Sequence, residues 1–330
     1  MHRLLERIAI SVVAFGLVPA CRTASNSSPA PTAEPSASGA AGSASPSTAS
    51  SGAFPITASS VDSVVNPQNL PVYDGPTGSV EGIIRVKGPA APPVHVDTSK
   101  CPAALDTYGK LFRDGPPDTP DGARPLADAV VVAVGTADHS AFYLPEKNPI
   151  VHLTVGPNCA YPSRTIALTY GQWLEVSNQT KLLFAPVIDQ TQTPAIMVAP
   201  PLENGEPVKI YPTRAGHFLL TDRMEVFVRE DLYVFRHSLH AVSDRSGHYR
   251  IDGVPVGKLN IGVHHPTVDA DAEVPVEVVA GVVQKVDLTI TYDPKLKARN
   301  DGGAPITSRC LRWLDPATKL KCAEYDKPND

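Results

Sequence analysis

The chain has 330 residues, a formal net charge of −5 at pH 7 and only 19% charged residues. This mildly acidic balance comes without a basic run or a basic-aromatic cluster, so composition argues against a nucleic-acid partner. The one long apolar stretch, residues 8–18, is too short to cross a bilayer. Beyond the first 60 or so residues, about 260 residues remain, which is enough for one large or two small domains.

The N-terminal segment is typical of an export signal. Arg3 and Arg7 precede the uncharged apolar stretch 8–18, and Ala20 stands directly before Cys21. Residues 17–21, Leu-Val-Pro-Ala-Cys, resemble the lipobox of bacterial lipoproteins, in which the cysteine receives diacylglycerol before cleavage; Pro19 departs from the usual pattern. The resemblance implies a signal peptide over 1–20 and lipid attachment at Cys21. The alternative is ordinary secretion, in which Cys21 is lost with the peptide.

A tether follows the cysteine. Residues 22–60 are almost entirely Ser, Ala, Pro, Thr and Gly, and Arg22 and Glu34 are their only charges. Such a segment buries too little apolar surface to fold, so we expect residues 21–60 to be a disordered tether that spans about 35 Å. In Gram-negative lipoproteins an acidic residue after the cysteine favours the inner membrane. With Arg22 there, the resemblance implies a cell-envelope protein on the outer membrane, facing the periplasm or the cell surface, held only by its lipid.

Four cysteines remain if Cys21 carries lipid. An even number in an exported protein suggests disulfides, and three connectivities are possible. We favour Cys101–Cys159 and Cys310–Cys322, since the second pair closes a short local loop. A four-thiolate metal site is the alternative, but no Cys-x-x-Cys spacing supports it.

The periodicity of the remaining chain is that of strands. Residues 286–292 and 166–170 alternate apolar and polar side chains, and residues 129–134 form a continuous apolar run that suits a strand buried on both faces. Turn signals such as Gly115-Pro116, Asn204-Gly205 and Asp252-Gly253 interrupt these runs at short intervals. Helical periodicity is absent apart from a short turn near 310–314. The predicted fold class is all-β, built from sandwiches.

Two families share motifs with the chain. Residues 78–88, 126–134 and 158–178 resemble exported cupredoxin-like proteins of the methylamine-utilisation or plastocyanin-like kind. Residues 237–257, with Asp244, Gly247 and Tyr249 ahead of Gly-Val-Pro-Val-Gly at 253–257, resemble the carboxypeptidase-regulatory-like (transthyretin-like) module.

The resemblances imply an order of domains. A cupredoxin-like β-sandwich is expected over 73–236, a smaller carboxypeptidase-regulatory-like β-sandwich over 237–293, and a C-terminal tail with a local disulfide over 294–330. The segment 79–86 also fits the opening strand of a regulatory-like module. If it pairs with 286–292, the first domain is an insertion in the second.

The resemblance also says where copper ligands belong. Copper-binding cupredoxins use two His and a Cys with a weak axial Met. Their first His falls at Phe184 here, and Asp222 and Glu225 stand roughly where the Cys and second His are expected, with Met224 out of place. No cysteine lies between positions 160 and 309. We therefore expect no type 1 copper centre, no metal site and no cofactor, although Asp222 and Glu225 with His217 form a set that a harder ion would bind loosely.

Two further clusters have both a metal-binding and a plain structural interpretation. His237 and His240, together with His264 and His265, would bind a metal if they converged, but nothing in the sequence brings the two pairs together, and surface or turn histidines are favoured. Asp269, Asp271 and Glu273 resemble the start of a calcium loop. Val274 and Ala280 stand where that loop needs Gly and Glu, so an acidic turn is expected.

No catalytic motif occurs in the sequence: there is no Gly-x-Ser-x-Gly, no His-Glu-x-x-His and no phosphate-binding Gly loop. We expect a non-enzyme, namely a lipid-anchored envelope protein that acts as a non-catalytic binding or structural module with a protein partner in the cell envelope. A periplasmic metal-handling or copper electron-transfer protein with an atypical site is the alternative. An enzyme with an unrecognised site is a third possibility.

Overall fold

The computed structural model describes residues 57–135, 144–189 and 207–295, all within the compact unit Ala49–Asp330. Sixteen strands dominate these residues, and the only helices among them are α1 (Ala58–Val65), α2 (Leu105–Tyr108) and the 3-10 turn η1 (Pro102–Ala104). The predicted all-β class is therefore confirmed. The strands form two sandwiches, each with its own core.

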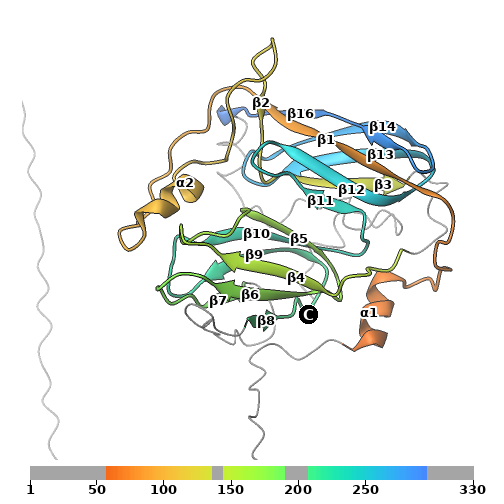
Figure 1. The fold of residues 1–330 in the computed structure, drawn as a ribbon, viewed down its shortest axis with the longest axis horizontal. Coiled ribbons are helices and arrows are strands. Elements are labelled where there is room, and N and C mark those ends of the chain that lie inside the picture. Colours follow the sequence, from red (N-terminus) through yellow and green to blue (C-terminus); the bar gives the residue numbers. More distant parts are fainter. Residues whose placement is uncertain (1–56, 136–143, 190–206, 296–330) are drawn as a thin grey trace, which may run out of the picture. The chain divides into compact units, whose positions relative to one another are not determined.

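The inserted sandwich contains the strands between β3 and β11 in the chain (Figure 1). One sheet has the order β4 (Ile150–Val155), β6 (Trp173–Asn178), β8 (Val208–Ile210); the other has the order β5 (Thr165–Thr169), β10 (Arg229–Phe235), β9 (Gly216–Asp222), β7 (Pro186–Ile188). Alternate side chains of each strand point between the two sheets, as in β6, where Leu174 and Val176 are fully buried. Leu168, Leu220 and Leu232 meet them from the second sheet.

The outer sandwich contains the remaining strands. In its first sheet, β1 (Thr77–Lys87) lies between β12 (His248–Pro255) and β15 (Val283–Lys285), and also pairs with β16 (Leu288–Thr291) and β2 (Arg124–Pro125) (Figure 1). The second sheet has the order β11 (His240–Val242), β3 (Val130–Gly135), β13 (Gly257–His265), β14 (Ala270–Val278). Val80, Ile251 and Ile261 belong to the core between these sheets.

Strand β1 joins distant parts of the chain. It runs antiparallel to β12 and parallel to β16, with Ile84 opposite Leu288 and Lys87 opposite Thr291. Gly82 allows the close approach on this side, because a Cβ there would lie 2.0 Å from the carbonyl oxygen of Val286. The pairing expected between the segments 79–86 and 286–292 is thus present.

The expected boundary at residue 236 does not follow the sheets. Strands β1, β2 and β3 belong to the range 73–236, yet β1 pairs with β12, β15 and β16, and β3 pairs with β11 and β13. The sandwich that contains residues 237–293 therefore has sheets of five and four strands, against four and three in the other, and is not the smaller one. Strand partners more than 100 residues apart leave no signal in local periodicity, so the division by consecutive ranges was wrong.

The two sandwiches pack through the outward faces of β3 and β10. Val130 and Val132 of β3 form one buried cluster with Tyr233 and Phe235 of β10, each 1% exposed or less. This explains why β10 is buried on both faces from Leu232 to Phe235 and why 129–134 is a continuous apolar run.

The expected tether ends earlier than residue 60, because α1 begins at Ala58. The Thr57 side chain accepts a hydrogen bond from the amide of Ser60, and Val61, Val64 and Val65 pack on the inserted sandwich. The expected signal peptide, Cys21, most of the tether and residues 296–330 lie outside the described residues. Among the described residues, no helix combines the length and apolar character needed to span a membrane.

Candidate functional site: the loop end of the inserted sandwich

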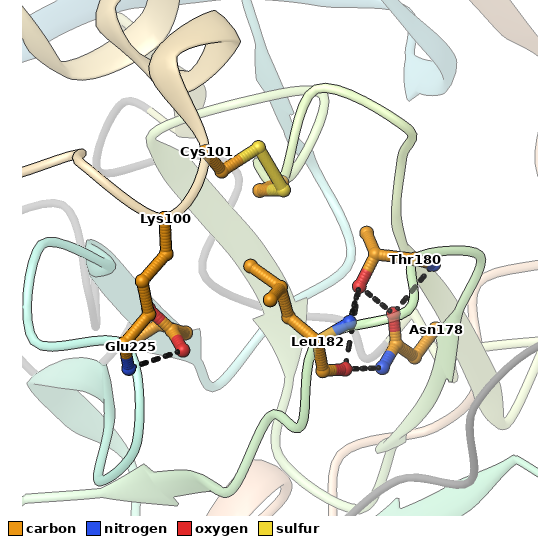
Figure 2. The surroundings of a disulfide bond; sticks show 7 residues. Lys100, Cys101, Asn178, Thr180, Leu182 and Glu225 are labelled. Carbon is orange, nitrogen blue, oxygen red and sulfur yellow. Dashed lines mark hydrogen bonds and ion pairs between the residues drawn. A yellow bond between two sulfur atoms is a disulfide. The ribbon is translucent and has the colours of Figure 1, made fainter.

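Three segments meet at one end of the inserted sandwich, and this region is called the loop end below. They are the loop 178–185 after β6, the hairpin 222–229 between β9 and β10, and the strap, residues 101–113 (Figure 2). The resemblance to cupredoxins places its ligand positions on the first two segments. The following contacts show which interactions the residues at these positions make in place of metal binding.

Asn178 fixes the first loop. Its Nδ2 donates to the carbonyl of Leu182 at 2.8 Å, and its Oδ1 accepts from the amide and hydroxyl of Thr180 at 2.8 and 2.9 Å (Figure 2). The side chain of Asn178 is buried, so these bonds satisfy a polar group that would otherwise be costly to place there. The loop that begins at the end of β6 is therefore held in one conformation.

Asp222 organises the hairpin in the same way. Its Oδ1 accepts from the amides of Met224 and Glu225 at 2.9 Å, and its Oδ2 accepts from the amide of Ala185 at 2.7 Å. The carboxylate is buried, and burial raises its pKa while the three amides act in the opposite direction. Asp222 thus joins the hairpin to the first loop, and its oxygen atoms are engaged by the backbone.

The strap starts at a disulfide. Cys101 and Cys159 are bonded, with Cα atoms 6.3 Å apart, so this predicted pair is confirmed; Cys310 and Cys322 lie outside the described residues. Beside it, Lys100 Nζ lies 3.1 Å from Glu225 Oε1, which attaches the segment to the hairpin (Figure 2).

The strap ends in the outer sandwich. Phe112 is buried in that core, with its ring centroid 4.9 Å from that of Tyr292. Arg113 forms a buried ion pair with Asp128, which precedes β3. The strap therefore bridges the two sandwiches, from the disulfide at one end to this ion pair at the other.

The centre of the strap covers a buried acid, Glu230, that sequence reasoning missed. Glu230 is 0% exposed, and Tyr108 Oη donates to its Oε1 at 2.5 Å. Burial raises the pKa of Glu230 to about 8, with the Tyr108 hydrogen bond opposing that rise. A signal was present: Glu230, Leu232 and Val234 alternate along β10, and a carboxyl at a core-facing position is unusual.

The predicted metal positions do not converge. Phe184 is fully buried in the apolar core. His217 alternates with Phe218 and so points to the opposite face of β9 from Asp222; its Nε2 lies 2.8 Å from Asp231 Oδ1. The loose ion set of Asp222, Glu225 and His217 is therefore wrong. Throughout the described ranges, no group of three or more His, Cys, Asp or Glu side chains is placed to hold a metal ion.

The histidines expected at surfaces or turns are partly buried. His240 Nε2 lies 3.0 Å from Thr169 Oγ1, and burial lowers its pKa to about 3. His237 is close to it, with ring centroids 6.3 Å apart. His264 and His265 are buried on β13, where His265 Nε2 faces the carbonyl of Ala127 at 3.1 Å. The expectation of surface or turn histidines is therefore wrong for His264 and His265, which are parts of the packed interior, whereas His237 lies on a bend and both it and His240 are partly exposed.

The acidic segment is mostly a strand rather than a turn. Asp269 occupies the turn after β13, with φ +57°, whereas Asp271 and Glu273 lie within β14. Glu273 accepts a hydrogen bond from the side chain of Asn260 on the neighbouring strand at 2.7 Å.

Exposed apolar side chains gather on the three segments of the loop end. Leu105 on the strap, Leu183 on the first loop, and Met224 and Val226 on the hairpin are 48%, 42%, 41% and 80% exposed. These four residues are called the loop-end patch. The segments contact one another, since the amide of Arg223 donates to the carbonyl of Ala185 and the rings of Tyr108 and Phe227 lie 5.5 Å apart.

Comparisons with known proteins find similarity only among solved structures. No protein-family model matches the sequence, and no curated protein matches it. Amicyanin from Paracoccus versutus is 14% identical over 32% of this chain and 98% of its own, with a TM-score of 0.23. A purple cupredoxin from Nitrosopumilus maritimus is 11% identical over 26% of this chain and 98% of its own, with a TM-score of 0.21. A Cu-containing nitrite reductase from Thermus scotoductus SA-01 is 16% identical over 31% of this chain and 25% of its own, with a TM-score of 0.22. Scores of this size assign neither a metal nor an activity to this chain.

Proposed function

We propose that this chain is a lipid-anchored cell-envelope protein whose loop end is a non-catalytic contact surface for a protein partner. The observation that carries the proposal is the loop-end patch, in which four exposed apolar side chains stand on segments fixed by Asp222, Asn178 and a disulfide. Large apolar side chains that share one rigid region favour an interface over a purely structural surface. The export signal and Cys21 supply the membrane attachment.

Lipid attachment is tested separately from partner binding. Replacement of Cys21 by Ser should move the protein from the membrane fraction to the soluble fraction, because a diacylated cysteine is the expected anchor. Labelling with a radioactive fatty acid should mark the wild type and leave the variant unmarked. A variant that stays membrane-bound to the same degree would contradict the anchor.

Partner binding is tested with matched valines. Val226→Asp places a charge on the most exposed residue of the patch, and Val283→Asp places one on β15 of the outer sandwich, where Val283 is 40% exposed. In-cell photo-crosslinking should join residues of the loop end to one defined envelope protein. Val226→Asp should reduce that product at least tenfold, with no effect from Val283→Asp. Equal loss in both variants, or no defined product, would overturn the contact surface.

The copper alternative has its own test. The purified protein is incubated with Cu(II) and examined for bound copper and for intense visible absorption, which a Cys-ligated type 1 centre produces. We expect neither at stoichiometric level, because Asp222 already accepts three backbone hydrogen bonds and Phe184 fills the core. Both together would make electron transfer the better assignment.

A further inference from the structure

The strap is held at three points of different character. The Cys101 disulfide fixes its start, and the Arg113–Asp128 ion pair fixes its end. Between them, the hydroxyl of Tyr108 reaches the fully buried Glu230. The first two attachments do not respond to moderate changes of pH, because a disulfide does not titrate and the pKa of Asp128 is lowered, whereas burial raises the pKa of Glu230 at the third.

Glu230 is fully buried and has a single hydrogen bond, from Tyr108; that bond favours the ionised form, but burial outweighs it and favours the neutral form. The titratable and charged groups that interact electrostatically with it are Tyr108 from the strap, Tyr161 from the segment before β5, Asp128 before β3, the cations Arg113 and Arg164, and Asp231, which points to the opposite face of β10. The cations are engaged elsewhere: Arg113 with Asp128, and Arg164 Nη1 with the carbonyls of Lys110 and Leu111 at 2.9 and 3.1 Å. Among the described residues, Glu230 Oε2 and Tyr161 Oη have no hydrogen-bond partner.

An ionised Glu230 would therefore lack a donor for Oε2 unless water reached it, and Tyr108 of the strap contacts its other oxygen. Tyr108 is 3% exposed, while Leu105 and Asp106 on the same short helix are exposed. Helix α2 has only four residues and no side-chain cap within the described chain, so lifting it costs little regular structure.

We propose that the neutral form of Glu230 latches α2 of the strap onto the loop end, and that its ionisation releases α2 while both ends of the strap stay attached. The released state exposes Glu230 and the rings of Tyr108 and Phe227 and displaces Leu105 from the loop-end patch. The latch stands without a partner; only its effect on partner contact rests on the proposed function.

Hydrogen exchange tests the latch in the whole protein with its disulfide intact. Protection of amides 105–111, corrected for intrinsic exchange rates, is compared at pH 6 and pH 9. For the wild type we expect protection to fall roughly 10- to 100-fold, because the ionised carboxyl favours the open state. Strand β13 serves as the internal reference and should keep its protection.

Two variants decide the cause. In Glu230→Gln, which removes the titrating group at nearly constant shape, protection of 105–111 should be the same at both pH values. Tyr108→Phe keeps the ring and removes the donor, so protection should be lower at pH 6 than in the wild type. If Glu230→Gln does not fold, Glu230→Leu replaces it. Wild-type protection that is unchanged by pH, or an equal fall in the Glu230 variant, would overturn the latch. Neither outcome bears on the crosslinking at Val226.

Discussion

The guanidinium of Arg113 lies against the carboxylate of Asp128 at the point where the strap and both sandwiches meet. Arg113 Nε lies 2.6 Å from Asp128 Oδ2, and both side chains are buried. Asp128 Oδ1 also accepts from Ser163 Oγ and from the amide of Arg164, both at 2.8 Å, just before β5 of the inserted sandwich. One carboxylate thus joins three parts of the chain. Burial, the largest single effect, works to raise its pKa, but the hydrogen bonds and charge of Arg113 together with the hydrogen bonds from Arg164 and Ser163 outweigh it, and the pKa of Asp128 is lowered.

Removing the carboxylate of Asp128 should strongly destabilise the folded protein. Asp128→Ala leaves the buried guanidinium of Arg113 without its partner, and breaking a buried pair in this way typically destabilises a protein by about 3–5 kcal/mol. Urea denaturation monitored by circular dichroism measures the loss. The control is Lys87→Ala, which breaks the exposed Lys87–Asp121 pair and should leave the denaturation midpoint unchanged. Equal unfolding free energies of the two variants would mean that the contacts of Asp128 do not stabilise the fold.

The disulfide should stabilise the protein by constraining the unfolded chain. Cys101 and Cys159 are 58 residues apart, and joining them removes loop entropy from the unfolded state. The Cys101→Ser, Cys159→Ser double variant should lose about 2–4 kcal/mol of unfolding free energy. Reduction of the wild type under denaturing titration should give nearly the same loss. A double variant as stable as the oxidised wild type would show that the strap is held by its other contacts alone.

His265 predicts part of the acid sensitivity. Its Nε2 donates to the carbonyl of Ala127, while its Nδ1 accepts from the amides of Thr267 and Val268 at 3.2 and 3.1 Å. Burial lowers its pKa to about 4. A folded pKa below the unfolded value means that this stability is complete above about pH 6.5 and is lost as the pH falls toward 4. Protonation places a hydrogen on Nδ1 and breaks both amide bonds.

The test is the slope of unfolding free energy against pH between 6.5 and 4.5. His265→Asn retains an acceptor near the Nδ1 position and cannot ionise. The slope of its unfolding free energy should therefore be smaller than that of the wild type by the contribution of up to one bound proton. His152→Asn makes the same substitution at an exposed histidine and serves as the control for the substitution itself. An unchanged slope in His265→Asn would assign the acid sensitivity to other groups.

The sequence was sufficient for the fold class and for one disulfide. Alternation in 166–170 and the apolar run at 129–134 identify strands because side-chain burial follows the local period. The apolar run at 129–134 does not indicate that β3 pairs with β11 and β13. Nor does it indicate that the outward face of β3 packs against Tyr233 and Phe235 of β10. Pairing at long sequence separation depends on which apolar faces find each other in three dimensions, and local pattern does not encode it.

The candidate site was predicted less completely. The resemblance to cupredoxins placed Phe184 and Asp222 at expected ligand positions, but the roles that these residues have depend on contacts from loops that only the fold brings together. Glu230 was recoverable from its core-facing place on β10. Its partner Tyr108 was not, because it is 122 residues away on a segment without strand periodicity.

Asp222 should determine the conformation of the hairpin that carries half of the loop-end patch, Met224 and Val226. Its two oxygens accept three backbone amides, from Ala185, Met224 and Glu225, in a buried position. Asp222→Ala leaves these donors without an acceptor and should cost about 2–3 kcal/mol. Asp222→Asn keeps an acceptor for the amides of Met224 and Glu225, but turns an amide group toward Ala185, so its loss of stability should be intermediate.

The control is Asp189→Asn, which makes the same carboxylate-to-amide change in the nearby Asp189–Arg223 ion pair. This pair is partly exposed, so the substitution should have little effect. Stability by denaturation and amide protection of residues 223–228 measure the series. The order Ala, Asn, then the control, from largest to smallest loss, is what the geometry requires, and a hairpin that keeps its protection in Asp222→Ala would show that the carboxylate does not hold it.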